Sequence, residues 1–152
     1  MGYNKGSDGG QGDGGQGDGG WHAPLRHIPA ADLSTETSQT TGMVRREAVS
    51  ARKVGSRRVW MGESTVAGRT ASQNHHHGDS ETGIYVVSGH PVFVFEEDGR
   101  EVRLAPEPGD YVFVPPYTAH REENPSDEPA VVVLARSTQD AIVVNLDGPL
   151  IR

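Results

Sequence analysis

Short runs of hydrophobic residues, separated by turn residues, extend over the chain from residue 43 onward. Valine, isoleucine and aromatic residues dominate these runs, which favours β-strands over helices. No segment keeps a 3.6-residue hydrophobic period over ten or more residues. The predicted strands cover 59–61, 84–87, 92–95, 102–104, 111–114, 131–134 and 142–146. Many short strands without intervening helices predict an all-β sandwich or barrel.

Turn residues support this division into strands. Asp98-Gly99 stands between two of the runs and is a dipeptide typical of tight β-hairpins. Pro108-Gly109-Asp110 marks a sharp start for the strand that follows. We therefore expect a hairpin at Asp98-Gly99 and a new strand after Asp110.

The N-terminal region differs from the rest of the chain. Residues 1–20 hold half of the 20 glycines, and the unit Gly-Gly-Gln-Gly-Asp occurs at 9–13 and again at 14–18. Such a segment cannot bury enough apolar surface to offset its backbone entropy. The sequence predicts a disordered tail over 1–20, an N-terminal arm over 21–42 and a barrel domain over 43–152.

Composition narrows the chemistry and the partners. The 152 residues suffice for one domain, and they include no cysteine, so any metal must be held by imidazole and oxygen ligands. A net charge of −7 argues against nucleic acid as a partner. No apolar run approaches the roughly 18 residues needed to span a bilayer. We expect a soluble cytoplasmic protein that binds neither nucleic acid nor membrane.

Two charged clusters have simple interpretations. Six basic residues fall within a short stretch: Arg45, Arg46, Arg52, Lys53, Arg57 and Arg58. Aromatic residues are not interleaved with them, so we interpret them as charges that protect edge strands from aggregation rather than as an anion-binding patch. The acidic residues Glu122, Glu123, Asp127 and Glu128 are expected in a solvated loop.

Histidines in two segments form the candidate functional site. His75, His76 and His77 are consecutive and begin a strand pattern, and His120 follows the turn at Pro115-Pro116. Side chains alternate faces along a strand, so His75 and His77 should project to one side and His76 to the other. His120 can join the first pair from a neighbouring strand. Neutral imidazole is a common ligand for zinc, copper, iron and nickel, so the pattern predicts a metal site.

These two segments resemble the two sequence motifs of the cupin superfamily. The second motif fits at every spacing through Gly109, Pro115, His120 and Asn124, and Tyr117 stands where the family usually has glycine. The resemblance implies a cupin-type jelly-roll β-barrel of two antiparallel sheets. It also implies one divalent metal ion, which could be Zn, Fe, Mn or Ni.

The first motif is looser, and it leaves the carboxylate ligand open. His75 and His77 match its His-x-His, and Glu81 follows after three residues, as the family allows. Seven residues then precede Gly89 instead of six, so counting back from Gly89 puts Thr82 at the glutamate position. A bulge near Gly83 would return Glu81 to the interior. Another register would use Asn74 and His76. The preferred ligand set is His75, His77, Glu81 and His120.

The resemblance implies a range of activities. The leading hypothesis is a metal-dependent enzyme that acts on a small oxygenated molecule, including aromatic or polyketide-like ones, by Lewis-acid-assisted cyclisation or isomerisation. Tyr117 is a candidate catalytic residue, as a general acid or as a group that orients a substrate oxygen. The alternatives are a non-haem metal dioxygenase and a non-catalytic small-molecule-binding protein. We also expect a homodimer.

Overall fold

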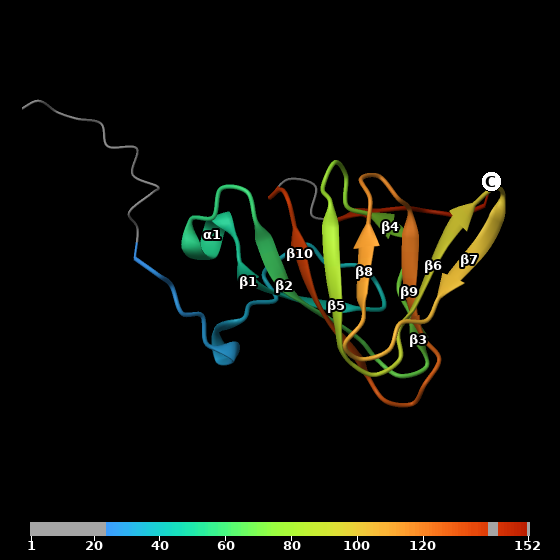
Figure 1. The fold of residues 1–152 in the computed structure, drawn as a ribbon, viewed down its shortest axis with the longest axis horizontal. Coiled ribbons are helices and arrows are strands. Elements are labelled where there is room, and N and C mark those ends of the chain that lie inside the picture. The colour runs from blue at the N-terminus through green and yellow to red at the C-terminus, as the bar shows by residue number, and fades with distance from the viewer. Residues whose placement is uncertain (1–23, 140–142, 152) are drawn as a thin grey trace, which may run out of the picture.

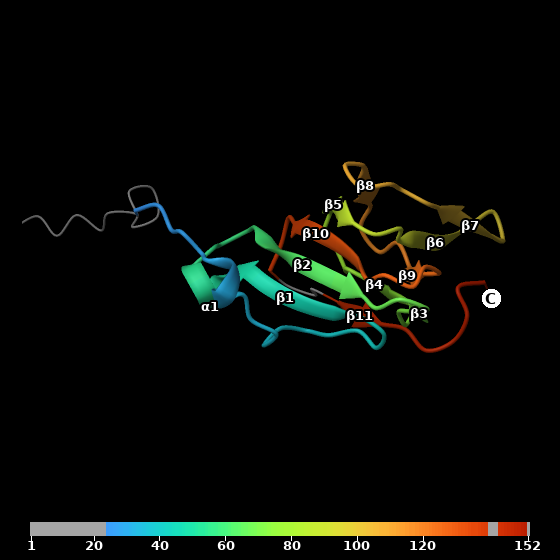
Figure 2. The same ribbon diagram turned by 90° about the horizontal axis from the view of Figure 1, so that it is seen from below.

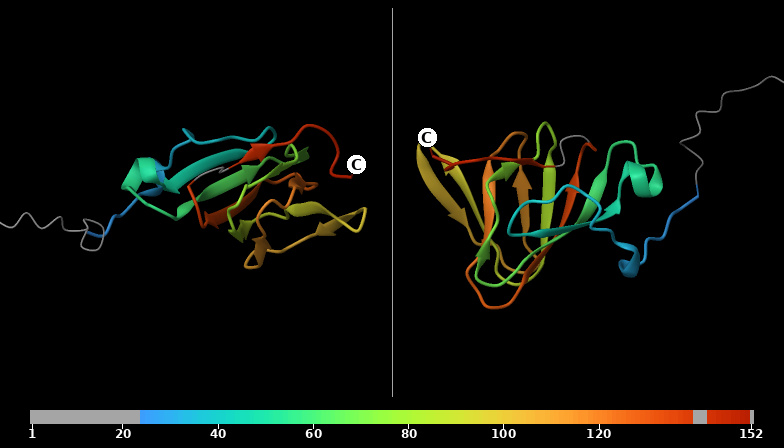
Figure 3. Two further views of the ribbon diagram at one scale, coloured as in Figure 1. Left: turned by 90° about the horizontal axis from the view of Figure 1, so that it is seen from above. Right: turned by 180° about the vertical axis from the view of Figure 1, so that it is seen from behind.

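The computed structural model describes residues 24–139 and 143–151. Two antiparallel sheets face each other and form a jelly-roll barrel (Figure 1), as the sequence predicts. The five-stranded sheet has the order β1 (Val44–Val49), β2 (Trp60–Val66), β10 (Ala130–Arg136), β5 (Thr82–Ser88) and β8 (Tyr111–Val114). The second sheet has the order β11 (Val144–Asn145), β4 (His75–His76), β9 (His120–Asn124), β6 (Val92–Glu97) and β7 (Arg100–Leu104), with β3 (Thr70–Ala71) also paired to β9. The strand β11, near the C-terminus, returns across the barrel to pair with β4 (Figure 3).

Only short helices occur among the described residues: the 3-10 turn η1 (Ala30–Asp32) and the single turn α1 (Ala51–Val54). The Ser50 side chain accepts a hydrogen bond from the Lys53 N–H, and Gly55 ends the turn in the left-handed conformation. A single turn is too short to show a helical period, which is why the hydrophobic pattern did not predict it. Neither helix is long and apolar enough to cross a membrane.

Strict alternation of inward and outward side chains builds the core. On β2 and β10, and on β5 from Thr82 to Val86, every second residue is buried, as the period of a half-buried strand requires. The core cluster consists of Trp60, Ile84, Val86, Phe93, Val114, Val132 and Leu134. Six of these residues lie on the five-stranded sheet and Phe93 lies on β6, so the cluster joins the two sheets.

The predicted hairpin is confirmed. Strands β6 and β7 pair from Phe93 with Leu104 to Glu97 with Arg100, which leaves Asp98-Gly99 as the two-residue loop. Asp98 has a φ of 51° and Gly99 a φ of 76°. Positive φ at both central residues is the geometry that matches the twist of the flanking strands.

The N-terminal arm is held to the barrel through Arg45 on β1. Arg45 is only 1% exposed, and its guanidinium donates to the Ser38 carbonyl at 2.9 Å and to the Thr40 hydroxyl at 3.0 Å. The Arg45 N–H also donates to the Gln39 side chain at 2.8 Å. Figure 2 shows this part of the arm running beside β1. The interpretation of Arg45 as a surface charge on an edge strand is therefore wrong, because its side chain turns inward to bind the arm.

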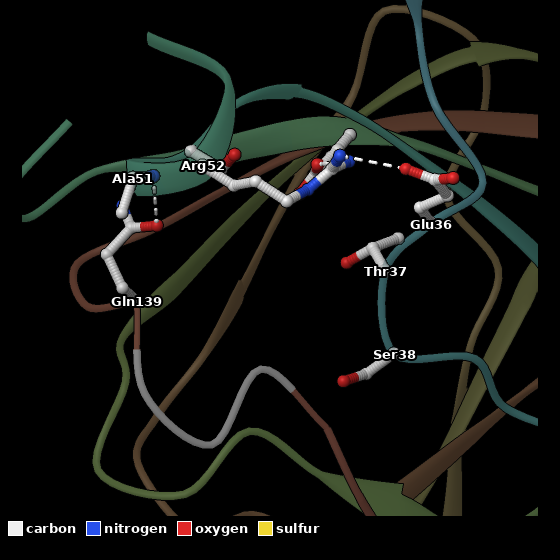
Figure 4. A pocket seen from close by; sticks show the side chains of 8 residues that line it. Glu36, Thr37, Ser38, Ala51, Arg52 and Gln139 are labelled. Carbon is white, nitrogen blue, oxygen red and sulfur yellow. Dashed lines mark hydrogen bonds and ion pairs between the residues drawn. The ribbon is translucent and has the colours of Figure 1, made fainter. Parts of the chain in front are cut away.

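A polar surface hollow of about 580 Å³ lies between the arm, α1 and the segment after β10 (Figure 4). Arg52 crosses this hollow to form an ion pair with Glu36 at 2.9 Å, and the Ala51 N–H donates to Gln139 at 2.9 Å. It shares no residue with the histidine cluster described below. The first contact joins the arm to α1, and the second joins α1 to the segment after β10. The predicted tail over 1–20 lies outside the described residues.

We expect Gly89→Ala to lower the free energy of unfolding by about 3 kcal/mol, the sum of left-handed strain and overpacking. Gly89 has a φ of 78°, and an added Cβ would lie 2.5 Å from the Pro129 carbonyl oxygen and 2.7 Å from the Ala130 Cα. The matched control is Gly99→Ala, which has a similar φ of 76° but meets nothing within 4 Å. Chemical denaturation should show a loss of about 1 kcal/mol for the control. Equal losses in the two variants would contradict the predicted clash.

Candidate metal centre

Three buried histidines meet between the two sheets. His75 lies on β4, and His77 is the first residue after that strand. His120 begins β9 and is the cross-strand partner of His75. One ligand atom from each ring lies within 4.8 Å of the others, and the three residues are at most 3% exposed. The structure thus brings together three of the four predicted ligands, and His76 points to the other side, as alternation along the strand requires.

Backbone carbonyls fix the orientation of two of the rings. The Nδ1 of His75 lies 2.9 Å from the Gln73 carbonyl oxygen, and the Nδ1 of His120 lies 2.9 Å from the Thr118 carbonyl oxygen. A carbonyl can only accept, so each Nδ1 carries the proton and each Nε2 presents a lone pair. Both Nε2 atoms are buried, and no described residue hydrogen-bonds to them. Buried, unpartnered and oriented imidazole nitrogens are the groups that a divalent metal ion requires.

The same burial keeps the rings neutral. Desolvation lowers the pKa of His120 to about 4, and the positive charges of Arg136 and Arg45 act in the same direction. Desolvation also lowers the pKa of His75 well below its ordinary value, with His120 as the next cause. Both rings are therefore unprotonated at neutral pH, and no proton has to leave them before a cation binds.

Glu81 lies outside this cluster, which corrects the expected fourth ligand. Its side chain is exposed, and its backbone N–H donates to the Ser137 hydroxyl at 3.0 Å. Strand β5 pairs with β8 in an unbroken register from Thr82 to Tyr85, so no bulge near Gly83 turns Glu81 inward. Thr82 occupies the inward position with 0% exposure. The structure thus adopts the alternative register, in which the residue counted back from Gly89 faces the interior.

Tyr117 also lies away from the three rings. It is 64% exposed, its N–H donates to the Gly78 carbonyl at 2.8 Å, and its ring stands 5.8 Å from that of His76. Its φ is 59°, in the left-handed region that favours glycine, which is the residue usual at this motif position. The turn therefore requires a left-handed backbone at this position, and the Tyr117 side chain points outward to solvent. This placement does not support Tyr117 as a general acid at the histidine cluster.

Besides Glu47, which pairs with Arg52, three buried charged residues escaped the sequence prediction. Arg45, Glu122 and Arg136 are at most 4% exposed, on β1, β9 and β10. Glu122 lies two residues after His120 on the same strand and so on the same face, which corrects its interpretation as part of a solvated loop. Arg136 continues the inward series of Val132 and Leu134, a signal that was missed because the predicted strand ended at residue 134. Burial raises the pKa of Glu122 to about 7, although Arg45 and Arg136 oppose the shift.

An apolar cleft adjoins the histidines. It has a volume of about 380 Å³, and His120 is one of its lining residues. Its other lining residues are Phe93, Phe95, Glu96, Glu97, Leu104, Val112, Phe113, Val114, Pro115 and Thr118. The volume falls within the range of small-molecule sites, and a mainly apolar wall with a few polar groups is typical of them. A substrate in this cleft would contact the edge of the metal centre.

The comparisons with known proteins agree with this geometry. A family model described as a cupin domain matches residues 62–136. No curated protein matches the sequence. The polyketide cyclase RemF from Streptomyces resistomycificus is 20% identical, with a TM-score of 0.63, and the match covers 83% of this chain and 88% of that chain.

A larger protein contains a similar barrel. Oxalate decarboxylase from Bacillus subtilis is 24% identical with a TM-score of 0.62, and the match covers 71% of this chain but only 28% of the decarboxylase. A second structure of that enzyme, from work on its Mn(II) centres, is 23% identical with a TM-score of 0.64. The match covers 76% of this chain and 30% of the decarboxylase. The chain therefore spans less than a third of the decarboxylase. At these identities the likeness shows the fold.

We expect the double variant His75→Ala, His120→Ala to bind no divalent metal, because it removes two of the three converging nitrogens. The matched control is His76→Asn in the same histidine run. The His76 ring accepts a hydrogen bond from the Gly78 N–H through its Nδ1, a role that the asparagine oxygen can take over. Metal analysis of dialysed protein should find about one ion per chain in the control, and full occupancy in the double variant would refute the site.

Glu81→Gln should leave metal affinity unchanged within about twofold, since the carboxylate is exposed and outside the cluster. A lost anionic ligand would instead weaken affinity by at least the roughly tenfold seen for residues that only support ligands. Competition titrations with a chromophoric chelator measure the difference, with His77→Ala as the positive control. A tenfold loss in Glu81→Gln would restore Glu81 to the ligand set.

Proposed function

The chain belongs to the cupin superfamily, and on that premise we propose that it is a metal-dependent enzyme that cyclises or isomerises a small oxygenated molecule. The observation that carries the proposal is the pair of oriented, unpartnered Nε2 atoms of His75 and His120 beside an apolar cleft. Three protein ligands leave positions for substrate or water, which is the arrangement of catalytic rather than structural metal sites.

The ligand set favours Lewis-acid chemistry. Imidazole ligands from His75, His77 and His120 carry no negative charge, and Glu81 lies outside the cluster, so a bound divalent ion would keep most of its positive charge. Such an ion polarises a carbonyl or enolate oxygen and stabilises the negative charge that develops there. The chain supplies the orientation: two carbonyls lock the rings, and the cleft holds the apolar part of the substrate and excludes water.

The substrate class follows from the cleft and from one structural neighbour. Phe93, Phe95 and Phe113 give the cleft an aromatic wall, which suits a flat or cyclising carbon skeleton. The polyketide cyclase RemF shares the fold over most of its length, which supports a polyketide-like substrate.

The expected homodimer, the cytoplasmic location and the absence of a nucleic-acid partner stay predictions.

We expect turnover of linear poly-β-ketone substrates by the full chain only when metal is bound, without consumption of oxygen. Metal-free protein is reconstituted separately with Zn, Fe, Mn or Ni, and products are followed by mass spectrometry beside an oxygen electrode. Reconstitution with zinc should suffice, because a Lewis acid needs no redox change. Glu81→Gln is the matched active control for the inactive His120→Ala.

Two outcomes would contradict this function. Turnover that requires Fe or Mn and consumes oxygen would indicate the dioxygenase alternative. Binding of substrate to the metal-loaded protein with no product under any metal would indicate a non-catalytic binding protein.

A further inference from the structure

Arg136 is a buried cation without a counter-charge in contact. Its side chain is 1% exposed, and none of its three guanidinium nitrogens finds a hydrogen-bond partner within the described residues. Its close neighbour is the Trp60 ring, whose centroid lies 4.6 Å from the guanidinium carbon. Stacking on an aromatic face holds the guanidinium but leaves its in-plane donors unused. Buried charges are normally paired, so this arrangement calls for an anion.

The residues beside Arg136 add further unused donors. Arg136 is directly opposite Trp60 on β2 and directly opposite Thr82 on β5. The Trp60 Nε1 and the Thr82 Oγ1 are both buried, and no described group hydrogen-bonds to them. Trp60, Arg136 and Thr82 thus form a row across three neighbouring strands. We call this row the donor row. Indole N–H, guanidinium and hydroxyl groups can all donate to an oxyanion.

Arg45 shows what a structural arginine looks like in the same interior. Its guanidinium is also buried, but it donates to the Ser38 carbonyl at 2.9 Å and to the Thr40 hydroxyl at 3.0 Å. Arg45 therefore has a role in holding the arm. Arg136 has no corresponding contact, so packing of the chain does not explain its donors.

Glu122 does not neutralise Arg136 by contact. No ion pair joins the two side chains in the described structure, and the Glu122 Oε2 also lacks a hydrogen-bond partner. The positive charge of Arg136 acts on His75 and His120, so the donor row lies within electrostatic reach of the metal centre. A ligand between them would meet the positive charge of Arg136 on one side and, once a metal ion is bound, that of the ion on the other.

We propose that the donor row of Trp60, Arg136 and Thr82 binds a carboxylate group of the substrate, opposite the three-histidine centre. A carboxylate is planar and matches the guanidinium fork with two parallel hydrogen bonds. This inference rests on the proposed function for placing the substrate between the two sheets. It adds that the substrate is an organic acid, with its apolar part in the cleft beside His120.

The test uses benzoate, with benzamide as its neutral analogue. The full chain carrying Trp21→Phe is stripped of metal, so that Trp60 is the only tryptophan and no metal can bind the carboxylate. Fluorescence titration should show benzoate binding at least about tenfold tighter than benzamide, as expected for hydrogen bonds to a charged group. Isothermal titration calorimetry should give the same ratio.

Arg136→Met should abolish this preference and raise the melting temperature of the metal-free protein, because an unpaired buried charge is replaced by an apolar chain. Arg136→Lys should retain part of the preference, since it keeps the charge but not the fork. The matched control is Arg46→Met, which removes an arginine paired with Glu63 and should leave the preference unchanged. Thr82→Val weakens benzoate binding several-fold and keeps the test decisive if Arg136→Met fails to fold.

Equal benzoate affinity in wild type, Arg136→Met and Thr82→Val would overturn the subsite, as would equal affinity for benzamide and benzoate. Metal content separates this inference from the proposed function. Arg136→Met should bind metal like the wild type, and His120→Ala should lose metal but keep the benzoate preference. Normal metal binding and turnover without any benzoate preference would reject the subsite alone.

Discussion

The interior of this barrel holds more polar groups than the chain itself can satisfy, and the rest of the structure follows from that constraint. Buried polar groups normally find partners within the protein, and each exception costs stability. Several of the exceptions lie on the two sheets: His75 and His120 on one sheet, and Thr82 and Arg136 on the other. A fold can keep such groups only if another part of it supplies the stabilisation.

The apolar core and the arm provide that support. Trp60, Ile84, Val86 and Leu134 pack together between the sheets.

Asn124 of the second motif is the opposite of the unsatisfied groups, because all of its side-chain polar atoms have partners. Its amide donates to the Val66 and Glu128 carbonyls, and its oxygen accepts from the Ser126 N–H and hydroxyl. The same motif thus contains a histidine left open for a ligand and an asparagine that closes a loop.

Alternation of side chains explains which parts of this arrangement the sequence reveals. Period two along short valine-rich runs is enough for the fold class, and His75 and His77 at i and i+2 are enough for two ligands. Asp98-Gly99 specifies its hairpin because the dipeptide suits positive φ at both positions.

The remaining features depend on pairing between strands rather than on local sequence. A difference of one residue in spacing decides whether Glu81 or Thr82 faces the interior. Only the register of β5 against β8 and β10 shows which of the two does so. Arg136 points inward because β10 extends beyond the hydrophobic run as far as Arg136, which pairs with Trp60 on β2 and with Thr82 on β5. The orientation of Tyr117 follows from its left-handed backbone, which the hydrophobic pattern does not reveal and which only the glycine usual at this motif position indicates.

The charge inside the barrel is opposite in sign to the net charge of the whole molecule. The chain carries a net charge of −7, yet two buried arginines, Arg45 and Arg136, share the interior with Glu122, whose pKa of about 7 leaves it partly neutral. The other buried carboxylate, Glu47, is paired with Arg52. A divalent ion held by three imidazoles would add further positive charge, which the partly neutral Glu122 would offset only in part. Exposed charges are screened within roughly 10 Å at ordinary ionic strength, whereas buried charges are screened far less. The outer surface therefore contributes little to the choice of ligand, and the interior favours anionic oxygen at both of its polar walls.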